Sequence, residues 1–413
     1  MTFFQKSFGC RLNQAEGARI ETAFEAAGFA PVQFGSSSDV IIINTCTVTQ
    51  KSENECLKLL RFFRKTQPGA FIVLTGCATA TANLDVAGAF ADIIVPQIQK
   101  DDLPALVMQK LACGLPAQPP GFVKPRTQRA LLKVQDGCDC FCTYCIVPFA
   151  RGTPRSRPFD ECLAEARALI ADGFQEIVVT GCNTAMYQDS GKNLMDLLRA
   201  LLALPGLGRL RLSSVEPRTF EREIVRLMAD EPKLCRYLHL PIQSGDNGVL
   251  RQMGRRYMVD HVRCALDEAY ERMPDISVGT DLIAGFPGET EDAIVKSYTL
   301  IETYPFSKVH VFPYNERPKT AAAEMPNQIS LPCRKRRTKK LIQLAEERRA
   351  EYLQRFIGKP VTMLVERVTA KGAALGWSAE YLACEAKNVD HGLARTLFTF
   401  TPTAIVDDTL VRE

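Results

Sequence analysis

The chain has 413 residues, of which 46% are hydrophobic, and its formal net charge is +4. This length predicts two or three domains with sizeable cores, and no stretch is apolar for long enough to span a membrane. The small charge excess gives no argument for a nucleic-acid partner. Fifteen cysteines, an odd count, follow a start unlike a signal peptide. We therefore expect a cytoplasmic protein whose thiols bind metal or act in catalysis.

Residues 1–115 predict an N-terminal open parallel α/β domain. Strands are expected at Phe3–Gly9, Val40–Thr45 and Phe71–Gly76, with helices between them. Strands separated in this way are parallel, so their ends meet at one carboxyl edge of the sheet. Each strand leads directly into a cysteine: Cys10, Cys46 and Cys77. One such cysteine would more often be a small buried hydrophobe, but three in successive units predict a site where three thiols converge on metal.

A proline-rich stretch, Leu115–Gly121, interrupts the pattern because proline cannot continue a helix. It predicts a linker over residues 116–128. Over residues 129–357 strand and helix alternate six times, which predicts a partial (βα)6 barrel rather than a full (βα)8 one. The expected strands are Leu131–Gln135, Ile177–Thr180, Leu210–Val215, Tyr237–Pro241, Ser277–Ile283 and Lys308–Phe312. In such a barrel, chemistry collects at the carboxyl ends of the strands.

The first barrel strand leads into the stretch Cys138–Cys145, which has the spacing C-x3-C-x2-C with Cys140 as an extra cysteine inside it. Three thiolates on one tight loop can hold three irons of a 4Fe-4S cluster and leave the fourth iron open to a small molecule. A structural zinc site that also uses Cys140 is the alternative, but such sites usually pair two separated halves. A catalytic cluster is therefore the favoured prediction.

Polar, glycine-bearing peptides follow the other barrel strands. They are Thr180–Asn183, Ser213–Pro217, Pro241–Gly245 and Asp281–Glu289. Each alone could be ordinary turn chemistry, in which glycine supplies unusual backbone angles. Their common position at strand ends predicts that they ring one cavity together with the cysteine loop.

With these motifs, the chain resembles the methylthiotransferases of the radical S-adenosylmethionine superfamily over essentially its whole length. The motifs that carry the resemblance occur in the family's order: F-G-C-R-L-N-Q, N-T-C-T-V, T-G-C, Q-D-G-C-D-C-F-C-T-Y-C-I-V-P-F-A-R-G, S-S-V-E-P, H-L-P-I-Q-S-G, M-G-R-R-Y and G-F-P-G-E-T. The resemblance implies two 4Fe-4S clusters and S-adenosylmethionine as cofactors. It assigns the radical cluster to Cys138, Cys142 and Cys145. It assigns the auxiliary cluster to Cys10, Cys46 and Cys77.

The resemblance also implies a radical S-adenosylmethionine barrel over residues 129–357 and a small C-terminal β-barrel, a TRAM-like domain, over residues 358–413. The alternating segment Val361–Glu366 and the segment Gly376–Tyr381 fit that domain. The expected fold class is therefore α/β, with an open parallel domain, a partial barrel and a small β domain in that order.

The chemistry implied by the resemblance begins with one electron from the radical cluster, which cleaves S-adenosylmethionine to a deoxyadenosyl radical. The radical removes hydrogen from carbon 2 of an adenine, where acid–base catalysis has no evident route. The auxiliary cluster then supplies sulfur, and a second S-adenosylmethionine supplies the methyl group. Four polar residues at the strand ends are candidates for holding S-adenosylmethionine: Glu216, Gln243, Ser244 and Asp281. Each could equally cap a turn or support a neighbouring side chain.

Within the family, the peptides G-C-R-L-N-Q-A-E and V-F-P-Y-N-E-R-P-K-T are most similar to the branch that modifies N6-threonylcarbamoyladenosine at position 37 of tRNA. This branch implies the tRNA anticodon loop as substrate and an electron donor such as a flavodoxin-type protein, without a membrane. The alternatives are methylthiolation of isopentenyladenosine in tRNA or of an aspartate in a ribosomal protein. An iron-sulfur protein that binds RNA or acts as a sensor, with no turnover, is the non-enzyme alternative. The oligomeric state does not follow from the sequence.

Two basic segments are candidates for contact with RNA or the active site. Residues 334–359 contain ten Lys or Arg against three Glu, and such runs are either a solvated helical face or a phosphate contact. Arg151–Arg157 follows the cysteine loop and is the candidate near the active site. Trp377 and Tyr381 could stack on unpaired bases or lie in a core, and we expect one of them in the core.

Overall fold

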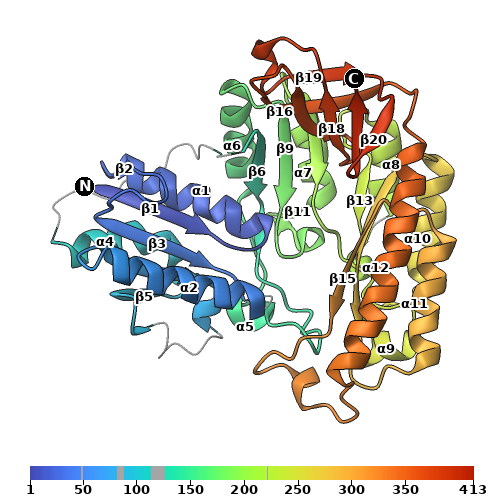
Figure 1. Ribbon diagram of the computed structural model, residues 1–413, viewed down its shortest axis with the longest axis horizontal. Helices are drawn as coiled ribbons and strands as arrows, with labels where there is room; N and C mark the ends of the chain where they lie inside the picture. Colours follow the sequence, from blue (N-terminus) through green and yellow to red (C-terminus); the bar gives the residue numbers. More distant parts are fainter. Residues whose placement is uncertain (48–49, 81–87, 113–124, 126, 221) are drawn as a thin grey trace.

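The computed structural model describes residues 1–47, 50–80, 88–112, 125, 127–220 and 222–413. The α/β fold has three parts that follow one another along the chain: an open parallel sheet, a partial barrel and a curled C-terminal sheet (Figure 1). The proline-rich stretch Leu115–Gly121 lies outside the described residues. The domain limits 1–115, 116–128, 129–357 and 358–413 therefore stay predictions.

The N-terminal sheet has the strand order β2-β1-β3-β4-β5, and all its neighbouring strands are parallel. Its strands are β1 (Thr2–Ser7), β2 (Ala30–Pro31), β3 (Val40–Thr45), β4 (Phe71–Gly76) and β5 (Ile93–Val95). Its helices are α1 (Arg11–Ala26), α2 (Gln50–Thr66) and α4 (Leu103–Lys110). All of β3 is buried because Val40 and Ile42 pack with α1 and α4 on one face, while Ile41 and Ile43 pack with α2 on the other. A continuous apolar run is typical of such a two-sided strand.

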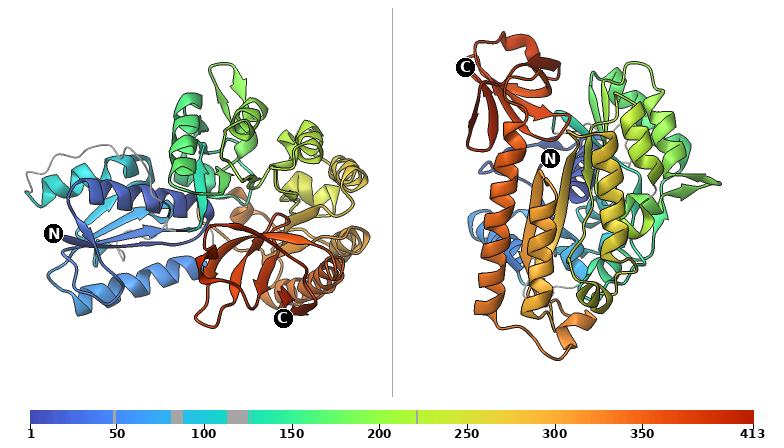
Figure 2. Two further views of the ribbon diagram at one scale, coloured as in Figure 1. Left: turned by 90° about the horizontal axis from the view of Figure 1, so that it is seen from above. Right: turned by 90° about the vertical axis from the view of Figure 1, so that its right-hand side faces the viewer.

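The barrel consists of six parallel strands, as the sequence predicts. They are β6 (Arg129–Lys133), β9 (Glu176–Thr180), β12 (Arg209–Leu212), β13 (Tyr237–His239), β14 (Ser277–Ala284) and β15 (Lys308–Pro313). They form two three-stranded sheets, β6-β9-β12 and β13-β14-β15, which a bridge from Ser214 to His239 connects. Among the described residues no pairing joins β6 to β15, so the barrel is open there. The start of α1 lies beside β6 on this side (Figure 2).

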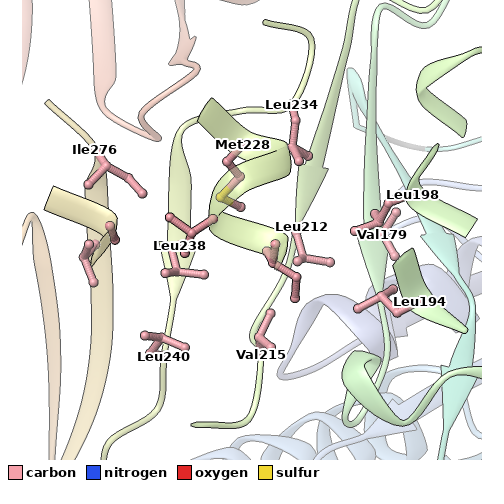
Figure 3. Packing of buried hydrophobic residues seen from close by; sticks show 14 of the residues in the cluster. Val179, Leu194, Leu198, Leu212, Val215, Met228, Leu234, Leu238, Leu240 and Ile276 are labelled. Carbon is pink, nitrogen blue, oxygen red and sulfur yellow. The ribbon is translucent and has the colours of Figure 1, made fainter. Parts of the chain in front are cut away.

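Helices cover the outside of the barrel. They are α6 (Phe159–Ala171), α7 (Leu194–Leu202), α8 (Arg222–Asp230), α10 (Val259–Arg272), α11 (Glu291–Thr303) and α12 (Leu331–Gln354). Their apolar faces and the strands share one large core. Leu212 of β12, Leu238 of β13 and Met228 of α8 pack together in it with Val215 and Leu240, which follow the two strands (Figure 3).

The C-terminal sheet has the strand order β19-β16-β17-β18-β21-β20. Its strands are β16 (Val361–Val368), β17 (Ala374–Ser378), β18 (Ala383–Ala386), β19 (Leu397–Phe400), β20 (Ala404–Val406) and β21 (Thr409–Arg412). Glu176 of β9, which is fully buried, pairs with Arg209 and Arg211 of β12. Both arginines also donate to backbone oxygens of the C-terminal sheet, including those of Trp377 and Ser378. This buried cluster, the Glu176 anchor, fixes the sheet to the amino ends of the barrel strands.

Short elements fill the connections. They are β7 (Gln135–Asp136), α5 (Val147–Arg151), β8 (Arg155–Ser156), β10 (Gln188–Asp189), β11 (Lys192–Asn193) and α9 (Asn247–Gln252). None of the described helices combines the length and the apolar character that crossing a membrane requires.

Candidate iron-sulfur and cofactor site

The cysteine loop, Cys138–Cys145, runs from β7 to α5 and is tied to the protein on both sides. The amide of Cys138 donates to the carbonyl of Gly152 at 3.1 Å, and the amide of Thr143 donates to the carbonyl of Met253 at 2.9 Å. Gly137 precedes the loop with a positive φ of 73°, and a Cβ there would overlap the carbonyl oxygen of Thr153. Only glycine fits this turn.

The thiols of the loop have polar partners. Arg255 donates to Sγ of Cys142 at 3.3 Å, and the amide of Cys140 donates to Sγ of Cys138 at 3.5 Å. The side-chain hydrogen bond from Cys140 lowers the pKa of Cys138, whereas burial raises the pKa of Cys145 to about 12. A cation and hydrogen-bond donors directed at thiol sulfur suit a group held by thiolates, so this donor set fits an iron-sulfur cluster.

The second set of cysteines lies where the sequence predicts, at the carboxyl edge of the N-terminal sheet. Cys10 directly precedes α1, Cys46 follows β3 and Cys77 follows β4. A Cβ on Gly9, whose φ is 88°, would lie 2.5 Å from Sγ of Cys46, so the backbone before Cys10 packs directly on that thiol. Sγ of Cys77 accepts a hydrogen bond from Nε of Arg151 at 3.2 Å.

Neither set of thiols closes around a single ion. In the part of the chain that the structure describes, no three His, Cys, Asp or Glu side chains have the geometry for one metal ion. A 4Fe-4S cluster attaches its cysteines to different irons. The two assignments of three cysteines each therefore stay predictions, supported by their position and by their donors.

A buried charge network surrounds the Cys77 side of the site. Glu16 binds Lys100 at 2.6 Å, Lys133 at 2.7 Å and Arg151 at 2.8 Å. Asp136 binds Lys133 and Arg151 at 2.8 and 2.9 Å. Burial alone would raise the pKa of Glu16, but the three cations outweigh it and hold that pKa well below its ordinary value. Three cations face two carboxylates, which leaves positive charge beside a predicted thiolate ligand.

The sequence predicts Arg151 near the active site but misses Glu16 and Lys100. Arg151 lies on α5, directly behind the cysteine loop, so its position follows from the motif. Glu16 and Lys100 are 84 residues apart and meet only through tertiary packing. The available signal was an acidic residue on the buried face of α1, six residues after Cys10.

Of the four residues predicted to hold S-adenosylmethionine, Glu216 lies close to the cysteine loop. Its carboxylate pairs with Arg255 at 3.0 Å, and the same guanidinium reaches Cys142. Burial raises the pKa of Glu216 although Arg255 opposes that rise. Gln243 is buried with a positive φ of 73°, a conformation that costs energy outside glycine and is often found at functional sites.

The other two candidates, Asp281 and Ser244, differ in their surroundings. The amide of Gln243 donates to the carbonyl of Asp281 at 2.8 Å, so these two candidates are neighbours. The carboxylate of Asp281 lies 3.2 Å from Nε2 of His239. Ser244 is buried, and its hydroxyl accepts from the amide of Asp246 at 3.2 Å, which is the turn-capping alternative rather than a free ligand contact.

Two buried polar atoms near the strand ends have no hydrogen-bond partner among the described residues. They are Oγ of Ser213 and Oδ1 of Asn183. Asn183 lies beside the cysteine loop, since its Nδ2 is 3.9 Å from Sγ of Cys140. Unsatisfied buried polar atoms are costly, so atoms of this kind at a strand-end rim fit a polar cofactor such as S-adenosylmethionine.

A cavity of 480 Å³ lies between the barrel strands, the start of α1 and the C-terminal sheet. We call it the barrel cavity. Strand-end residues Gly181 and Ser213 line it together with Asp281 and with Cys10. The strand ends after β9 and β12 therefore share one cavity with β14, which is part of what the sequence predicts, but the cysteine loop Cys138–Cys145 is not among the residues that line it. The Pro241–Gly245 peptide is not among the residues that line it.

Trp377 and Tyr381 both line the barrel cavity, and neither belongs to any of the buried hydrophobic clusters of the described residues. Their rings stack at a centroid distance of 4.8 Å, and both side chains are half-buried. We expected one of them in a core. The strand β17 ends at Ser378, and Tyr381 follows in a turn with a φ of 63°, which directs the pair towards the barrel.

The basic segment at residues 334–359 is only partly a candidate for RNA contact. Arg337 is buried and pairs with Glu289 at 2.7 Å, and Arg334 is buried and donates to the carbonyl of Tyr314. With Leu341, these arginines recur at helical spacing on the covered face of α12. They attach α12 to the barrel, whereas Lys335 and Lys339 stay exposed.

Comparison with known proteins agrees with this architecture. Residues 132–301 match the model of the radical SAM superfamily, and residues 2–95 match the uncharacterized protein family UPF0004. The radical S-adenosylmethionine methyltransferase TsrM from Kitasatospora setae shares the fold with a TM-score of 0.61 and 17% identity, over 78% of this chain and 76% of that one. The barrel with its cysteine loop therefore belongs to the radical S-adenosylmethionine class.

Relatives that the chain matches over most of their length identify the family within the radical S-adenosylmethionine class. The chain is 33% identical to threonylcarbamoyladenosine tRNA methylthiotransferase MtaB of Thermotoga maritima, over 92% of this chain and 90% of the relative. It is 32% identical to tRNA-2-methylthio-N(6)-dimethylallyladenosine synthase of Zymomonas mobilis, over 88% and 86%. The chain belongs to the radical S-adenosylmethionine methylthiotransferase family. Its cofactors are accordingly two 4Fe-4S clusters and S-adenosylmethionine.

Proposed function

We propose that this enzyme methylthiolates carbon 2 of N6-threonylcarbamoyladenosine at position 37 of tRNA. The observation that carries the proposal is the barrel cavity, which Cys10 and the carboxyl ends of β9 and β12 line together with Asp281 of β14. One adenine in this cavity would have the auxiliary site on one side and the cofactor rim on the other. The family membership and the match to MtaB relatives support the same reaction and substrate class.

The chain's own residues would hold two clusters. We assign one to Cys138, Cys142 and Cys145. We assign the other to Cys10, Cys46 and Cys77. When bound, these groups supply the electron that cleaves S-adenosylmethionine and the sulfur that is transferred. With three cysteine ligands, each cluster would keep one iron open to a small molecule.

Two arginines position the predicted ligands. Arg255 contacts Cys142 and Glu216 at once, so it fixes the cysteine loop relative to a candidate S-adenosylmethionine contact. Arg151 contacts Cys77 and the carboxylates of Glu16 and Asp136. Hydrogen bonds to ligand atoms orient the ligand and tune the bound group.

The electron donor of the proposal is a flavodoxin-type protein in the cytoplasm. Phe141 in the cysteine loop is 58% exposed, and Phe149 next to it is 45% exposed, with the two rings in edge-to-face contact. An exposed aromatic pair formed by the cysteine loop and the adjoining α5 would give a donor protein a short path to a cluster held by that loop.

The test is anaerobic turnover. The protein is reconstituted with iron and sulfide and given dithionite and S-adenosylmethionine. Its substrate is tRNA from a strain that lacks this enzyme, and nucleosides are analysed by mass spectrometry. We expect a methylthio gain on threonylcarbamoyladenosine with wild type and with the control Cys264→Ala, an exposed cysteine on α10. Cys142→Ala should abolish it. Deoxyadenosine without any change in nucleoside mass would overturn the substrate, and a gain on isopentenyladenosine would overturn the branch.

A further inference from the structure

The side of the barrel cavity near the C-terminal sheet carries two cations without acidic partners. Arg11 is the first residue of α1, and Lys308 is the first residue of β15. Both are half-buried. The guanidinium of Arg11 lies over the ring of Tyr381 at 4.7 Å. Within the described ranges, neither cation forms an ion pair with a carboxylate.

The other charged groups that line the cavity are already paired. Asp281 lies against His239, and Arg349 binds the carboxylate of Asp408 at 2.7 Å. Burial and the nearby Arg349 lower the pKa of Lys308. A half-buried ammonium group beside Tyr381 and Arg349, whose own partner Asp408 opposes only part of this effect, is destabilised unless another anion joins it. The cavity therefore has an excess of positive charge from Arg11 and Lys308.

The geometry of adenine relates this charge to the substrate. In adenine, carbon 2 and carbon 6 are both bonded to N1, and the bonds that leave the ring at these two atoms diverge, so the N6 group and carbon 2 can contact different parts of one cavity. With carbon 2 at the rim formed by Cys10 and Ser213, the N6 group would extend past Tyr381, over whose ring Arg11 lies, towards the side of the cavity that Lys308 lines. A cavity of 480 Å³ is within the usual range for a small-molecule site.

We infer that Arg11 and Lys308 form an anion subsite that binds the carboxylate of the threonylcarbamoyl group, and that this subsite selects the modified adenosine. The inference rests on the proposed function and specifies its substrate recognition. An isopentenyl group has no charge and would leave both cations unpaired in the cavity. Because Arg11 directly follows Cys10, one turn of chain would supply both a ligand of the auxiliary cluster and a contact to the substrate.

The experiment measures binding of threonylcarbamoyladenosine nucleoside and of its methyl ester to the reconstituted protein, by anaerobic equilibrium dialysis. The ester keeps the shape and removes the charge. We expect the acid to bind about tenfold more tightly than the ester, as a charge-assisted hydrogen bond implies. In Lys308→Gln the preference should fall to less than twofold, and Lys308→Arg should restore it. Lys335→Gln, which removes the same charge from the exposed face of α12, should leave the preference unchanged.

The outcomes separate this inference from the proposed function. Equal binding of acid and ester by wild type, or a full preference in Lys308→Gln, overturns the anion subsite even if tRNA is methylthiolated. A preference for the acid that Lys308→Gln removes supports the subsite even if tRNA turnover fails. Arg11→Gln gives the second readout, because it should weaken binding of the acid and leave binding of the ester within twofold of wild type.

Discussion

The two cysteine sites of this enzyme are built in opposite ways. The loop at Cys138–Cys145 holds its three predicted ligands within eight residues, and hydrogen bonds to Gly152 and Met253 fix its path. The other site takes one cysteine from the end of each of three chain segments, and its supporting charges come from both the N-terminal sheet and the barrel. The first is a local structure. The second exists only while two parts of the chain stay packed together.

The largest effect is expected at the assembled site. Arg151→Met leaves the buried carboxylates of Glu16 and Asp136 with one cation fewer to balance their negative charge. It also removes the hydrogen-bond donor to Sγ of Cys77. Breaking a buried ion pair from one side costs about 3–5 kcal/mol. Urea unfolding should show this loss, and iron analysis should show one cluster fewer while deoxyadenosine formation persists.

Arg199→Met is the control for that variant, because Arg199 pairs with Glu223 on the exposed surface. Exposed pairs contribute about 0–1 kcal/mol. Equal losses of unfolding free energy in the two variants would contradict a special role for the buried network around Glu16. Loss of both clusters in Arg151→Met would contradict the independence of the cysteine loop.

The next effect is expected at the local site. Arg255→Leu removes the donor to Cys142 and the partner of Glu216. Charge-assisted hydrogen bonds contribute about 1.5–3 kcal/mol, so S-adenosylmethionine should bind about tenfold or more weakly. Anaerobic binding titration measures this, with the exposed Arg251→Leu as the control. An unchanged dissociation constant would remove Glu216 and Arg255 from the cofactor contacts.

The dependence of stability on pH tests the charge network of the assembled site. The cations around Glu16 outweigh the effect of burial and lower its pKa well below the ordinary 4.5. A carboxyl with a lower pKa in the folded than in the unfolded state contributes stability above about pH 4.5 and loses it as the pH falls below that value. Unfolding free energies measured from pH 6 to pH 3 should therefore fall more steeply for wild type than for Glu16→Gln. The exposed Glu347→Gln should follow wild type, and parallel curves for Glu16→Gln would refute the role of the network.

The smallest effect is expected at Cys140. This cysteine is not among the predicted iron ligands and contacts Cys138 only through its amide and thiol. Cys140→Ser keeps a hydrogen-bonding group, so iron content should stay unchanged and deoxyadenosine formation should stay within about twofold. Loss of bound metal in this variant would instead favour the zinc site of four cysteines.

The contrast between the two sites also explains what the sequence could predict. The six barrel strands and the parallel N-terminal sheet follow from short apolar segments that alternate with helical ones along the chain. The cysteine loop follows from the spacing of its cysteines. Arg334 and Arg337 look like part of a basic surface, yet the helical period buries them against Glu289 and the barrel. The pairing of Glu16 with Lys100 and Lys133 is fixed by packing between distant segments, so no short-range pattern contains it.

The Glu176 anchor has a consequence for the order in which the enzyme becomes complete during its synthesis. Trp377 and Tyr381 form the last wall of the barrel cavity, and the anchor holds that wall against β12. Parts of a chain fold in the order in which they leave the ribosome. Both sets of cysteines are therefore made more than 200 residues before the cavity acquires this wall. A nascent chain could take up iron long before it could enclose a nucleoside.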